Sequence, residues 1–557
     1  MSKDSREENI MKLSGAQIII EQLCLNGVTT VFGYPGGYVL PIYDELYRNA
    51  DRIHHIITAH EQGAAHAADG YARASGRTGV VIATSGPGAT NLVTGIASAY
   101  LDSIPMVAIT GNVAEHMLGK DSFQEVDIIG ITQPIVKHNF VIRDIRTLEH
   151  TMNEAFRIAN SGRRGPVLVD VPRNIQEEKC EYNGDPPESG SGRAFQFDIS
   201  QAVMAINSCK KPYIYAGGGV LASGAEAELQ ALSERISAPV GLSMMGLTTL
   251  PKSYNLNLGM CGMHGRYAAT VAQSECDLLI ALGVRFSDRA TGNIETYIQG
   301  RVIIHVDIDF AEIGKNVPPQ IGIRGDAKAV LMELLKALPK KKNTAWLSRV
   351  GELKQADKKQ LGGNFTPKQI IESISGICDG DTIIATDVGQ HQMWTMQYYP
   401  FMKPRTLLTS GGLGAMGYGM GAAIGGCIAK DKKRTILITG DGSFGMNLTE
   451  LATAVSQRLP IVIVIINNGV LGMVRQWQNV LYGKRYSHTT LNRKTDFVML
   501  AKAFGADGYI ADNPCQLRHI LENLPATGPV VIDCLIDMDE QVLPMIPPGG
   551  SVENIMT

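Results

Sequence analysis

The junction between an apolar run and the Gly-Asp-Gly at residues 440–442 constrains the fold of this chain more than any other feature. Residues 435–439 (TILIT) predict a buried strand, and apolar side chains recur at a helical spacing after the glycines. A second apolar run, residues 461–466, ends in two asparagines. Strand, helix and strand form a βαβ unit. It brings Asp441 and Asn468 to the ends of neighbouring strands, where open parallel sheets bind ligands.

The residue types at this junction suit a metal ion and a diphosphate. The Asp441 carboxylate, the Asn468 amide oxygen and a nearby backbone carbonyl, that of Val470, are the hard donors that Mg²⁺ takes together with phosphate oxygens. The helix that follows points free N–H groups at the same place. Between Thr439 and Arg458 the sequence has no Lys or Arg, so a metal would have to neutralise the phosphates. The alternative is a ligand-free sheet with turn glycines and a capping Asn.

Strand and helix patterns alternate in three blocks of the 557 residues. The pattern predicts an α/β protein with three doubly wound parallel-sheet domains. The first and third blocks both have apolar strands followed by glycine turns, which is compatible with two similar sheets. We expect domains at residues 12–180, 195–338 and 366–536, a Pro/Gly/Ser-rich linker at 181–194, a charged connector at 340–363, and a tail at 537–557.

Composition excludes several classes of protein. Charged residues are 19% of the chain and the net charge is −3, so the basic excess of a nucleic-acid-binding surface is missing. The first ten residues mix charges without an apolar core, so we expect no secretory signal. No apolar run approaches the roughly 18 residues of a membrane helix. The nine cysteines are scattered without a CxxC pair, which predicts reduced thiols and a cytoplasmic location.

Two motifs together resemble those of thiamine-diphosphate enzymes: the GDG…NN pair, and residues 58–73 (TAHEQGAAHAADGYAR). Glu61, at a predicted helix start, is stabilised by the helix dipole, which by itself fits an ordinary first-turn acid. The resemblance implies instead that Glu61 bonds the aminopyrimidine of the cofactor and promotes loss of the thiazolium C2 proton. It also implies an obligate homo-oligomer, in which Glu61 and Asp441 of different subunits share one site. The three domains would then bind the pyrimidine, FAD and the diphosphate.

Three glycine-punctuated loops narrow the resemblance: residues 32–37 (FGYPGG), 84–91 (TSGPGATN) and 119–125 (GKDSFQE). Each alone fits a simple turn, but together they resemble the catalytic subunits of the acetohydroxyacid synthase (acetolactate synthase) family. The resemblance implies that Phe123 and Gln124 line the active site and that Gly37 lies near the reacting carbon. It implies thiamine-diphosphate contacts from Glu61, Pro87, Asn91, Val388, Gly389, Gln390, His391, Gly414, Met416, Gly440, Asp441, Gly442, Ser443, Asn468, Gly472, Met473 and Val474, with Mg²⁺ on Asp441, Asn468 and Val470.

Within these contacts, Met416 stands among glycines and resembles the family's wedge between the two rings of the cofactor, a place that suits a soft, polarizable side chain. A plain core methionine is the alternative.

Glycine turns after apolar runs in the second block, such as residues 211–220 and 277–289, resemble the flavin segments of the same family. A glycine turn lets a pyrophosphate approach the backbone, although a ligand-free linker domain is the alternative. The resemblance implies an FAD without net redox chemistry, structural or a relic of an oxidase ancestry. Ser287 stands where the family has an acid, and Arg164 where it often has Pro. The implied FAD contacts are Arg163, Gly217, Gly218, Gly219, Gly262, Met263, His264, Gly265, Gly283, Val284, Arg285, Asp288, Asp307, Ile308, Gly325 and Asp326.

Four residues are expected to contact substrate: Arg289, Trp477, Lys137 and Arg173. By resemblance Trp477 favours 2-ketobutyrate over pyruvate as second substrate, although its helical spacing with Met473 and Val474 also fits a core stripe. Arg289 is the candidate for the carboxylate of that substrate, which a guanidinium grips with two bonds. Arg173 stands where the family usually has Lys, a residue that differs in shape and hydration. The tail, residues 542–550 (VLPMIPPGG), resembles a closing lid.

The resemblance implies decarboxylation of pyruvate and its carboligation to a second 2-keto acid. The product is 2-acetolactate, or 2-aceto-2-hydroxybutyrate, which begins valine, leucine and isoleucine biosynthesis. Alternatives are a fermentative, flavin-free synthase, a flavin-redox relative such as pyruvate oxidase, and a non-catalytic paralogue. Intact Glu61, Asp441 and Asn468 argue against the last. The sequence leaves open dimer or tetramer, and a separate small regulatory subunit.

Overall fold

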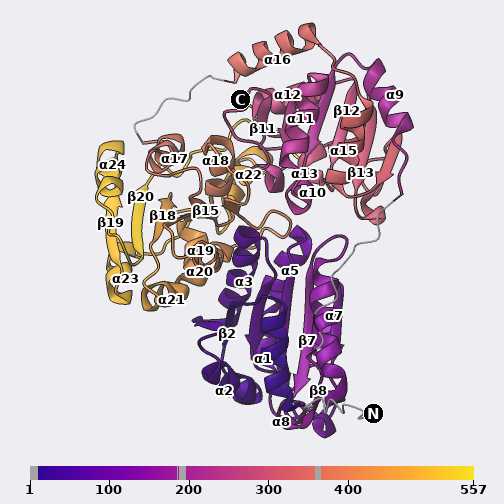
Figure 1. The fold of residues 1–557 in the computed structure, drawn as a ribbon. Helices are drawn as coiled ribbons and strands as arrows, with labels where there is room; N and C mark the ends of the chain where they lie inside the picture. Colours follow the sequence, from indigo (N-terminus) through magenta and orange to yellow (C-terminus); the bar gives the residue numbers. More distant parts are fainter. Residues whose placement is uncertain (1–10, 185, 187–195, 358–364) are drawn as a thin grey trace, which may run out of the picture. The chain divides into compact units, whose positions relative to one another are not determined.

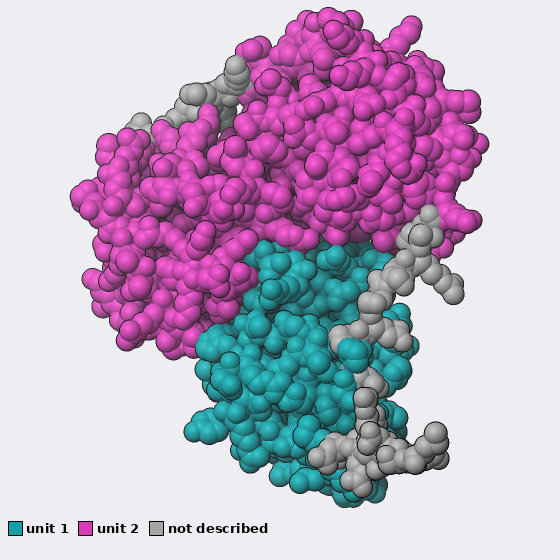
Figure 2. All heavy atoms as spheres, in the orientation of Figure 1, with its two compact units in different colours: residues 1–192 teal, residues 193–557 magenta. Residues whose placement is uncertain are grey.

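The computed structural model describes residues 11–184, 186, 196–357 and 365–557. The chain divides into two compact units, residues 1–192 and 193–557 (Figure 2). In the described part of the chain, no helix combines the length and the apolar character that crossing a bilayer requires.

The first unit is built on one parallel sheet of order β3-β2-β4-β5-β7-β6, with helices beside it (Figure 1). Its inner strands are buried on both faces, which explains why they read as continuous apolar runs without alternation. A small antiparallel pair, β1 (Met11–Ser14) and β8 (Lys179–Tyr182), joins the two ends of the unit. The strands are β2 (Thr30–Tyr34), β3 (His54–Ile57), β4 (Gly79–Ala83), β5 (Met106–Asn112), β6 (His138–Val141) and β7 (Pro166–Pro172), and the main helices are α1 (Gly15–Leu25), α2 (Leu40–Arg48), α3 (Glu61–Ser75), α5 (Val93–Asp102) and α7 (Leu148–Asn160).

The first sheet of the second unit has the order β11-β10-β9-β12-β13-β14, all parallel. Counted along the chain this is the 3-2-1-4-5-6 order of dinucleotide-binding folds. The strands are β9 (Pro212–Ala216), β10 (Val240–Leu242), β11 (Asn257–Met260), β12 (Leu278–Leu282), β13 (Val302–Asp307) and β14 (Ile321–Arg324), with α9 (Ser200–Ser208), α10 (Gly218–Ser223), α11 (Glu226–Ile236), α12 (Tyr267–Glu275), α13 (Asp288–Thr291) and α15 (Ala327–Ala337).

The second sheet of this unit has the order β16-β15-β17-β18-β20-β19, also parallel. Counted along the chain, its order is that of the sheet in the first unit, so the prediction of two similar sheets is confirmed. The strands are β15 (Ile383–Thr386), β16 (Leu407–Leu408), β17 (Thr435–Gly440), β18 (Ile461–Asn467), β19 (Asp507–Ala511) and β20 (Val530–Leu535), with α17 (Pro367–Gly376), α18 (Gln390–Tyr398), α19 (Tyr418–Ala429), α20 (Asp441–Asn447), α21 (Leu451–Ser456), α22 (Gly472–Leu481), α23 (Phe497–Phe504) and α24 (Pro514–Glu522).

Three doubly wound parallel sheets therefore confirm the predicted fold class. The two sheets of the second unit share one buried core, which includes Leu242 of one sheet and Ile436 of the other. Polar contacts reinforce this junction: the Gln397 side chain donates to the His264 carbonyl (3.0 Å), and Arg266 donates to the Gln397 carbonyl (3.0 Å). The second and third blocks are therefore packed as one body.

The segment expected to be a charged connector contains a packed helix. α16 (Thr344–Ala356) buries Trp346, Val350 and Leu353 against the core below β9 and β12, and the Trp346 indole N–H donates to the Pro212 carbonyl (3.0 Å). The apolar residues are three or four apart, a spacing that the surrounding charges obscured. The rest of this segment from residue 358, and residues 187–194 of the predicted linker, lie outside the described residues.

Candidate functional site

The predicted junction of Asp441 with the two asparagines forms as expected. Gly440, the last residue of β17, pairs with Ile466 of β18, so the residues that follow both strands meet at one edge of the sheet. Asp441 is 9% exposed and borders a pocket of about 130 Å³ that Asn467 and Arg493 also line. Burial raises the pKa of Asp441 to about 6, and the nearby Asp533 adds to the shift, whereas backbone N–H groups and Arg493 oppose it.

Asp441 has no ion-pair partner among the residues that the structure describes. A buried carboxylate without a cation is unfavourable, and a divalent ion would remove that cost. No group of three or more His, Cys, Asp and Glu side chains suited to a metal occurs in the described residues. A cation here would therefore depend on mixed oxygen donors from Asp, Asn and backbone, a set that fits Mg²⁺.

The loop after β18 is held in place by its own side chains. The Asn468 amide oxygen accepts from the Val470 N–H (3.2 Å), and its amide nitrogen donates to the Gln390 side-chain oxygen (3.1 Å). Asn467 donates to Asp533 (3.0 Å). Backbone bonds to residues 489–491 pin the loop on both sides of Val470. Gln390, placed at the diphosphate by resemblance, thus also orients a predicted metal ligand.

The strand order reverses between β15 and β17, and the remaining predicted diphosphate residues gather at this switch point. Gly389, with φ +154°, precedes α18, and a Cβ there would lie 2.8 Å from the His391 ring. A Cβ on Gly440 would lie 2.9 Å from Nδ1 of the same ring. The Ser443 hydroxyl donates to the Val388 carbonyl (2.8 Å).

His391 supplies a second sign of a missing ligand. Burial lowers the pKa of His391 to about 3, so the imidazole is neutral. Its Nε2 is buried and has no hydrogen-bond partner within residues 365–557 or elsewhere in the described chain. Buried polar atoms are nearly always paired, so an orphaned one at a sheet switch point fits a bound cofactor.

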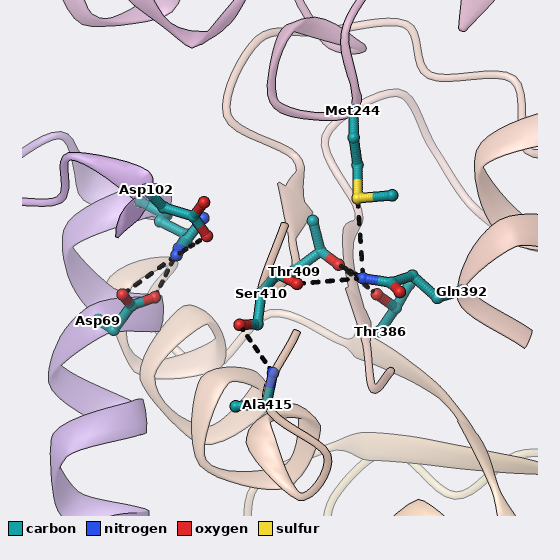
Figure 3. A network of polar contacts seen from close by, with 9 residues as sticks. Asp69, Asp102, Met244, Thr386, Gln392, Thr409, Ser410 and Ala415 are labelled. Atoms are coloured by element: carbon teal, nitrogen blue, oxygen red, sulfur yellow. Dashed lines mark hydrogen bonds and ion pairs between the residues drawn. The ribbon is translucent and has the colours of Figure 1, made fainter. Parts of the chain in front are cut away.

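The loop that carries Met416 is fixed by a buried network that sequence reasoning missed. Gln392 donates to the Thr409 hydroxyl (2.8 Å), which shares a hydrogen bond with Thr386 (2.7 Å); the Ser410 hydroxyl accepts from the Ala415 N–H (3.2 Å) (Figure 3). The run of polar residues at 386–392, in an otherwise apolar region, was the available signal.

Asp387 anchors the other end of this loop. Its carboxylate accepts from the Gly417 N–H (2.8 Å), next to Met416. A Cβ on Gly442 would meet the Met416 methyl at 3.9 Å. The predicted wedge residue therefore lies beside the Gly440–Gly442 turn.

In the first unit, the predicted residues meet at the carboxyl ends of β2, β3 and β4. Glu61 begins α3 and accepts from the Asn91 amide (3.0 Å). A Cβ on Gly88 would lie 3.3 Å from the other Glu61 oxygen, so the glycine leaves that oxygen open. Pro87 is the first residue of α4 (Pro87–Asn91). The carboxylate is half-buried at the N-terminus of α3.

The loops with Gly37 and Gln124 lie beside this acid. The Tyr38 hydroxyl donates to the Phe123 carbonyl (3.1 Å), and a Cβ on Gly86 would strike the Gln124 carbonyl at 2.7 Å. Gly37 has open space around it, and the Phe123 side chain is 79% exposed on this unit. The predicted active-site residues of the first block are therefore clustered.

A buried ion triad holds α3 in place. The Arg73 guanidinium pairs with Asp69 (2.5 Å) on its own helix and with Asp102 (2.9 Å) at the end of α5 (Figure 3). All three side chains are almost fully buried. Arg73 and Asp69 belong to the motif that contains Glu61, and their role is to support the helix that begins with it.

Three basic residues of the first unit were predicted to contact a ligand, and two of them lie at the edge of the sheet opposite Glu61. The Lys137 ammonium donates to the carbonyls of Ile158 and Ser161, which cap the end of α7. The Arg163 side chain donates to the Ser103 hydroxyl (2.8 Å). Both precede strands β6 and β7 and so occupy the opposite edge of the sheet. Arg173 follows β7 and pairs with Glu177 (3.0 Å).

The predicted flavin residues of the second unit lie at or beyond the carboxyl ends of the strands of the central sheet. Its order reverses between β9 and β12, where three glycines touch. A Cβ on Gly217 would lie 2.3 Å from the Gly283 carbonyl oxygen, and one on Gly219 would lie 2.6 Å from the Gly283 Cα. This bare backbone fits a pyrophosphate. The neighbours at the same edge are Gly218, Val284 and Arg285 after β9 and β12, Gly262, Met263, His264 and Gly265 after β11, and Ile308 and Gly325 after β13 and β14.

The polar residues at this edge differ in burial and in their hydrogen-bond partners. The His264 Nδ1 is buried without a partner in the described chain, and burial lowers the pKa of His264 to about 4. Asp307 is buried at the end of β13. Asp326 instead caps α15 and accepts from the Ser223 hydroxyl (2.8 Å). Ser287 and Asp288 are exposed at the start of α13. His264 and the glycine turn are the features that best fit a flavin.

Gly283→Ala should abolish flavin binding by this turn. The left-handed φ of +56° and a Cβ contact of 2.5 Å with the Gly219 backbone both oppose a side chain there. We expect the purified variant to lack the absorbance of bound flavin near 450 nm. Gly224→Ala is the control, because Gly224 has a similar φ (+62°) but open space around it. Equal flavin content in both variants would contradict the assignment.

The two main substrate candidates meet in the structure. The Arg289 guanidinium of α13 lies 4.8 Å from the centre of the Trp477 ring of α22. Arg289 is 56% exposed, and its only ion-pair contact among the described residues is a long one, 3.8 Å, with Asp288. The Trp477 indole N–H is buried without a partner in the described part of the chain. An apolar wall and a cation side by side suit a small carboxylate with an alkyl group.

Three family models match successive parts of the chain. They are described as the N-terminal TPP binding domain, the central domain and the C-terminal TPP binding domain of thiamine pyrophosphate enzymes, and match residues 13–131, 199–334 and 387–534. The sheets and sites described above thus belong to a thiamine pyrophosphate enzyme.

Curated relatives narrow the class. The probable acetolactate synthase large subunit of Methanocaldococcus jannaschii is 46% identical over 98% of this chain and 95% of its own. The acetolactate synthase large subunits of Buchnera aphidicola and Lactococcus lactis are 41% and 43% identical, over 98% and 96% of this chain and 98% and 95% of theirs. The chain belongs to the acetolactate synthase large-subunit family. The resemblance drawn from the motifs is confirmed.

Proposed function

We propose that this chain decarboxylates pyruvate and joins the remaining two carbons to a second 2-keto acid, forming 2-acetolactate when that acid is pyruvate. The observation that carries the proposal is the arrangement at the β15–β17 switch point. There Asp441, a buried carboxylate without an ion-pair partner in the described chain, follows Gly440, and the ring of His391, whose Nε2 has no hydrogen-bond partner there, packs against the same glycine. The relatives, which are acetolactate synthase large subunits by name, support the same reaction.

Bound thiamine diphosphate would supply the nucleophilic carbon and the electron sink for decarboxylation. Asp441, the Asn468 amide oxygen and the Val470 carbonyl would hold Mg²⁺, and the N-terminus of α20 would receive phosphate oxygens. The neutral His391 and the Gly389 turn would border the diphosphate. Met416, fixed by bonds at both ends of its loop, would hold the two rings in position.

Glu61 would hold a proton at a ring nitrogen of the aminopyrimidine and so favour loss of the C2 proton. Glu61 and Asp441 belong to different compact units of this chain. We propose that they act together across two copies, so that the working enzyme is a homodimer or homotetramer. Gly37, Phe123 and Gln124 would surround the reacting carbon, and none of them is an acid that could protonate a carbanion before it reacts.

The second unit would also bind FAD, which the net reaction does not require. Support comes from the Gly217–Gly219 turn against Gly283 and from the unpartnered His264. The tail, which packs at Met263 through Ile546 (2.9 Å), would exclude water as a lid. We further propose that the enzyme is cytoplasmic and biosynthetic, and that it accepts 2-ketobutyrate as second substrate. A separate small regulatory subunit would bind this chain.

One incubation tests the proposal. Purified protein with Mg²⁺ and thiamine diphosphate receives pyruvate with or without 2-ketobutyrate, and with or without FAD, and the products are identified. We expect CO₂ release with acetolactate, and 2-aceto-2-hydroxybutyrate when both acids are present. Consumption of oxygen or quinone with flavin reduction at the rate of turnover would favour an oxidase instead. Absence of CO₂ would indicate a non-catalytic relative.

Trp477→Leu should lower the preference for 2-ketobutyrate while acetolactate formation continues. An apolar wall discriminates one methylene by about 1–3 kcal/mol, which corresponds to a roughly 10- to 200-fold preference. The measurement is the product ratio when the two acids compete. Leu481→Ala, on the same helix and exposed, is the control. An unchanged ratio would mean that Trp477 only fills space.

A further inference from the structure

The side chain of Gln476 links the tail to the loop of Asn468. Gln476 is 4% exposed on α22. Its amide oxygen accepts from the Val542 N–H (2.9 Å), and its amide nitrogen donates to the Val542 carbonyl (3.1 Å). Both backbone groups of one tail residue are thus satisfied by one side chain, as a neighbouring strand would satisfy them.

The Gln476 side chain is also hydrogen-bonded to Gln390, which in turn contacts Asn468. The Gln476 oxygen also accepts from the Gln390 amide nitrogen (3.1 Å), which donates to the Glu540 carbonyl as well (2.8 Å). The Gln390 oxygen accepts from the Asn468 amide (3.1 Å). The path from Val542 to Asn468 therefore consists of two buried glutamines. We call Gln476 and Gln390 the amide relay.

The relay has little freedom to rearrange. A Cβ at Gly472 would lie 1.9 Å from the Gln390 oxygen, so a glycine there is what admits the side chain. If the side-chain amide of Gln390 rotated by 180°, its nitrogen would face the Asn468 amide nitrogen, which is also a donor. Its oxygen would face the acceptor oxygens of Gln476 and Glu540. Buried amides that leave partners unsatisfied are costly, so the observed orientation of both glutamines is strongly favoured.

Beyond Val542 the tail is well packed. Val542 and Met545 are buried, and Met545 exchanges two backbone bonds with Met556. The Ile546 N–H donates to the Met263 carbonyl (2.9 Å), and the Gly550 carbonyl accepts from Asn293 (3.2 Å). The tail thus spans both sheets of the second unit. The relay is one connection between the tail and the Asn468 loop, and the ion pair of Arg475 with Asp539 (2.8 Å) joins the same helix α22 to the tail.

We propose that the amide relay couples docking of the tail to cation binding at Asn468, with Gln476 as the positioning residue. A cation that takes the Asn468 oxygen fixes the amide, which fixes Gln390 and Gln476 in the orientation that receives Val542. A docked tail in turn holds Asn468 ready for the cation. Linkage requires both effects to have the same size. The inference rests on the proposed function, because it takes Asn468 as a ligand of Mg²⁺.

The test uses the full-length chain and Gln476→Met, which keeps the volume but removes the three hydrogen bonds that the Gln476 amide makes with Val542 and Gln390. Hydrogen exchange of the peptide that covers residues 540–546 is measured with and without Mg²⁺ and thiamine diphosphate, and the Mg²⁺ affinity is measured by calorimetry. In the wild type, we expect the ligands to slow exchange of the tail by about five-fold or more. In Gln476→Met, we expect that protection to disappear and the Mg²⁺ Kd to rise by a similar factor.

Gln230→Met is the control. Gln230 lies on α11 of the same unit, and its side-chain amide donates to Glu234 (2.9 Å), away from the tail and from the Asn468 loop. It should match the wild type in both measurements. Should Gln476→Met fail to fold, Gln476→Glu keeps the shape and the acceptors but loses the donor to Val542, and we expect the same two changes.

The outcomes separate the two proposals. If the tail of Gln476→Met exchanges hydrogen quickly but the Mg²⁺ affinity is unchanged, Gln476 only holds the tail in place. That result would overturn the coupling. If hydrogen exchange of the wild-type tail is the same with and without Mg²⁺ and thiamine diphosphate, the coupling is overturned as well. A wild-type protein that binds neither Mg²⁺ nor thiamine diphosphate would overturn the proposed function, and the relay with it.

Discussion

Glu61→Gln should bind thiamine diphosphate as the wild type does and lose about 10²- to 10⁴-fold in turnover, the contribution of a well-placed acid–base group. Glutamine keeps the shape of the side chain and the oxygen that accepts from the Asn91 amide (3.0 Å). It cannot hold or release the proton at the aminopyrimidine. Binding of the cofactor is measured by calorimetry and turnover by acetolactate formation from saturating pyruvate.

Glu115→Gln is the control for this variant. Glu115 follows β5 of the same sheet and is half-buried like Glu61, so it tests for a general effect of losing one acid at this edge. We expect it to retain wild-type turnover. A Glu61→Gln enzyme with normal turnover would remove the proposed activation, and one that no longer binds the cofactor would assign Glu61 to binding.

Asp441→Asn should weaken Mg²⁺-dependent binding of thiamine diphosphate by at least about 100-fold. Residues that merely support a metal ligand contribute 10- to 100-fold in affinity, and a direct charged ligand contributes at least as much. The affinity is measured by titrating the protein with thiamine diphosphate at fixed Mg²⁺. Asp512→Asn is the control, because Asp512 also follows a strand of this sheet, β19, but at its far edge.

The stability of Asp441→Asn distinguishes lost binding from misfolding. The pKa of Asp441 is raised to about 6 by burial, so above that pH the ionised carboxylate costs stability in the metal-free protein. We expect the metal-free variant to melt at the same temperature as the wild type or higher. Mg²⁺ with cofactor should raise the melting temperature of the wild type only. A variant that is stabilised as much as the wild type would exclude Asp441 as a ligand.

The sequence by itself determined the three sheets and the meeting of Asp441 with Asn467 and Asn468. Buried parallel strands read as continuous apolar runs, and the glycine turns after them mark their carboxyl ends. In a parallel sheet those ends lie on one edge. The family resemblance of the local motifs placed Glu61 with Gln124 and Gly217 with Gly283, and the structure brings Gly217 against Gly283 at one sheet edge.

Only the tertiary structure decided which side chains meet across long separations in the chain. Arg289 stacks on Trp477, and Gln476 bonds Val542, although neither pair leaves a periodic trace. It also decided that Lys137 caps a helix. A polar residue reads the same in sequence whether water, a carbonyl or a ligand satisfies it. Its partner depends on burial, which packing of the whole chain alone establishes.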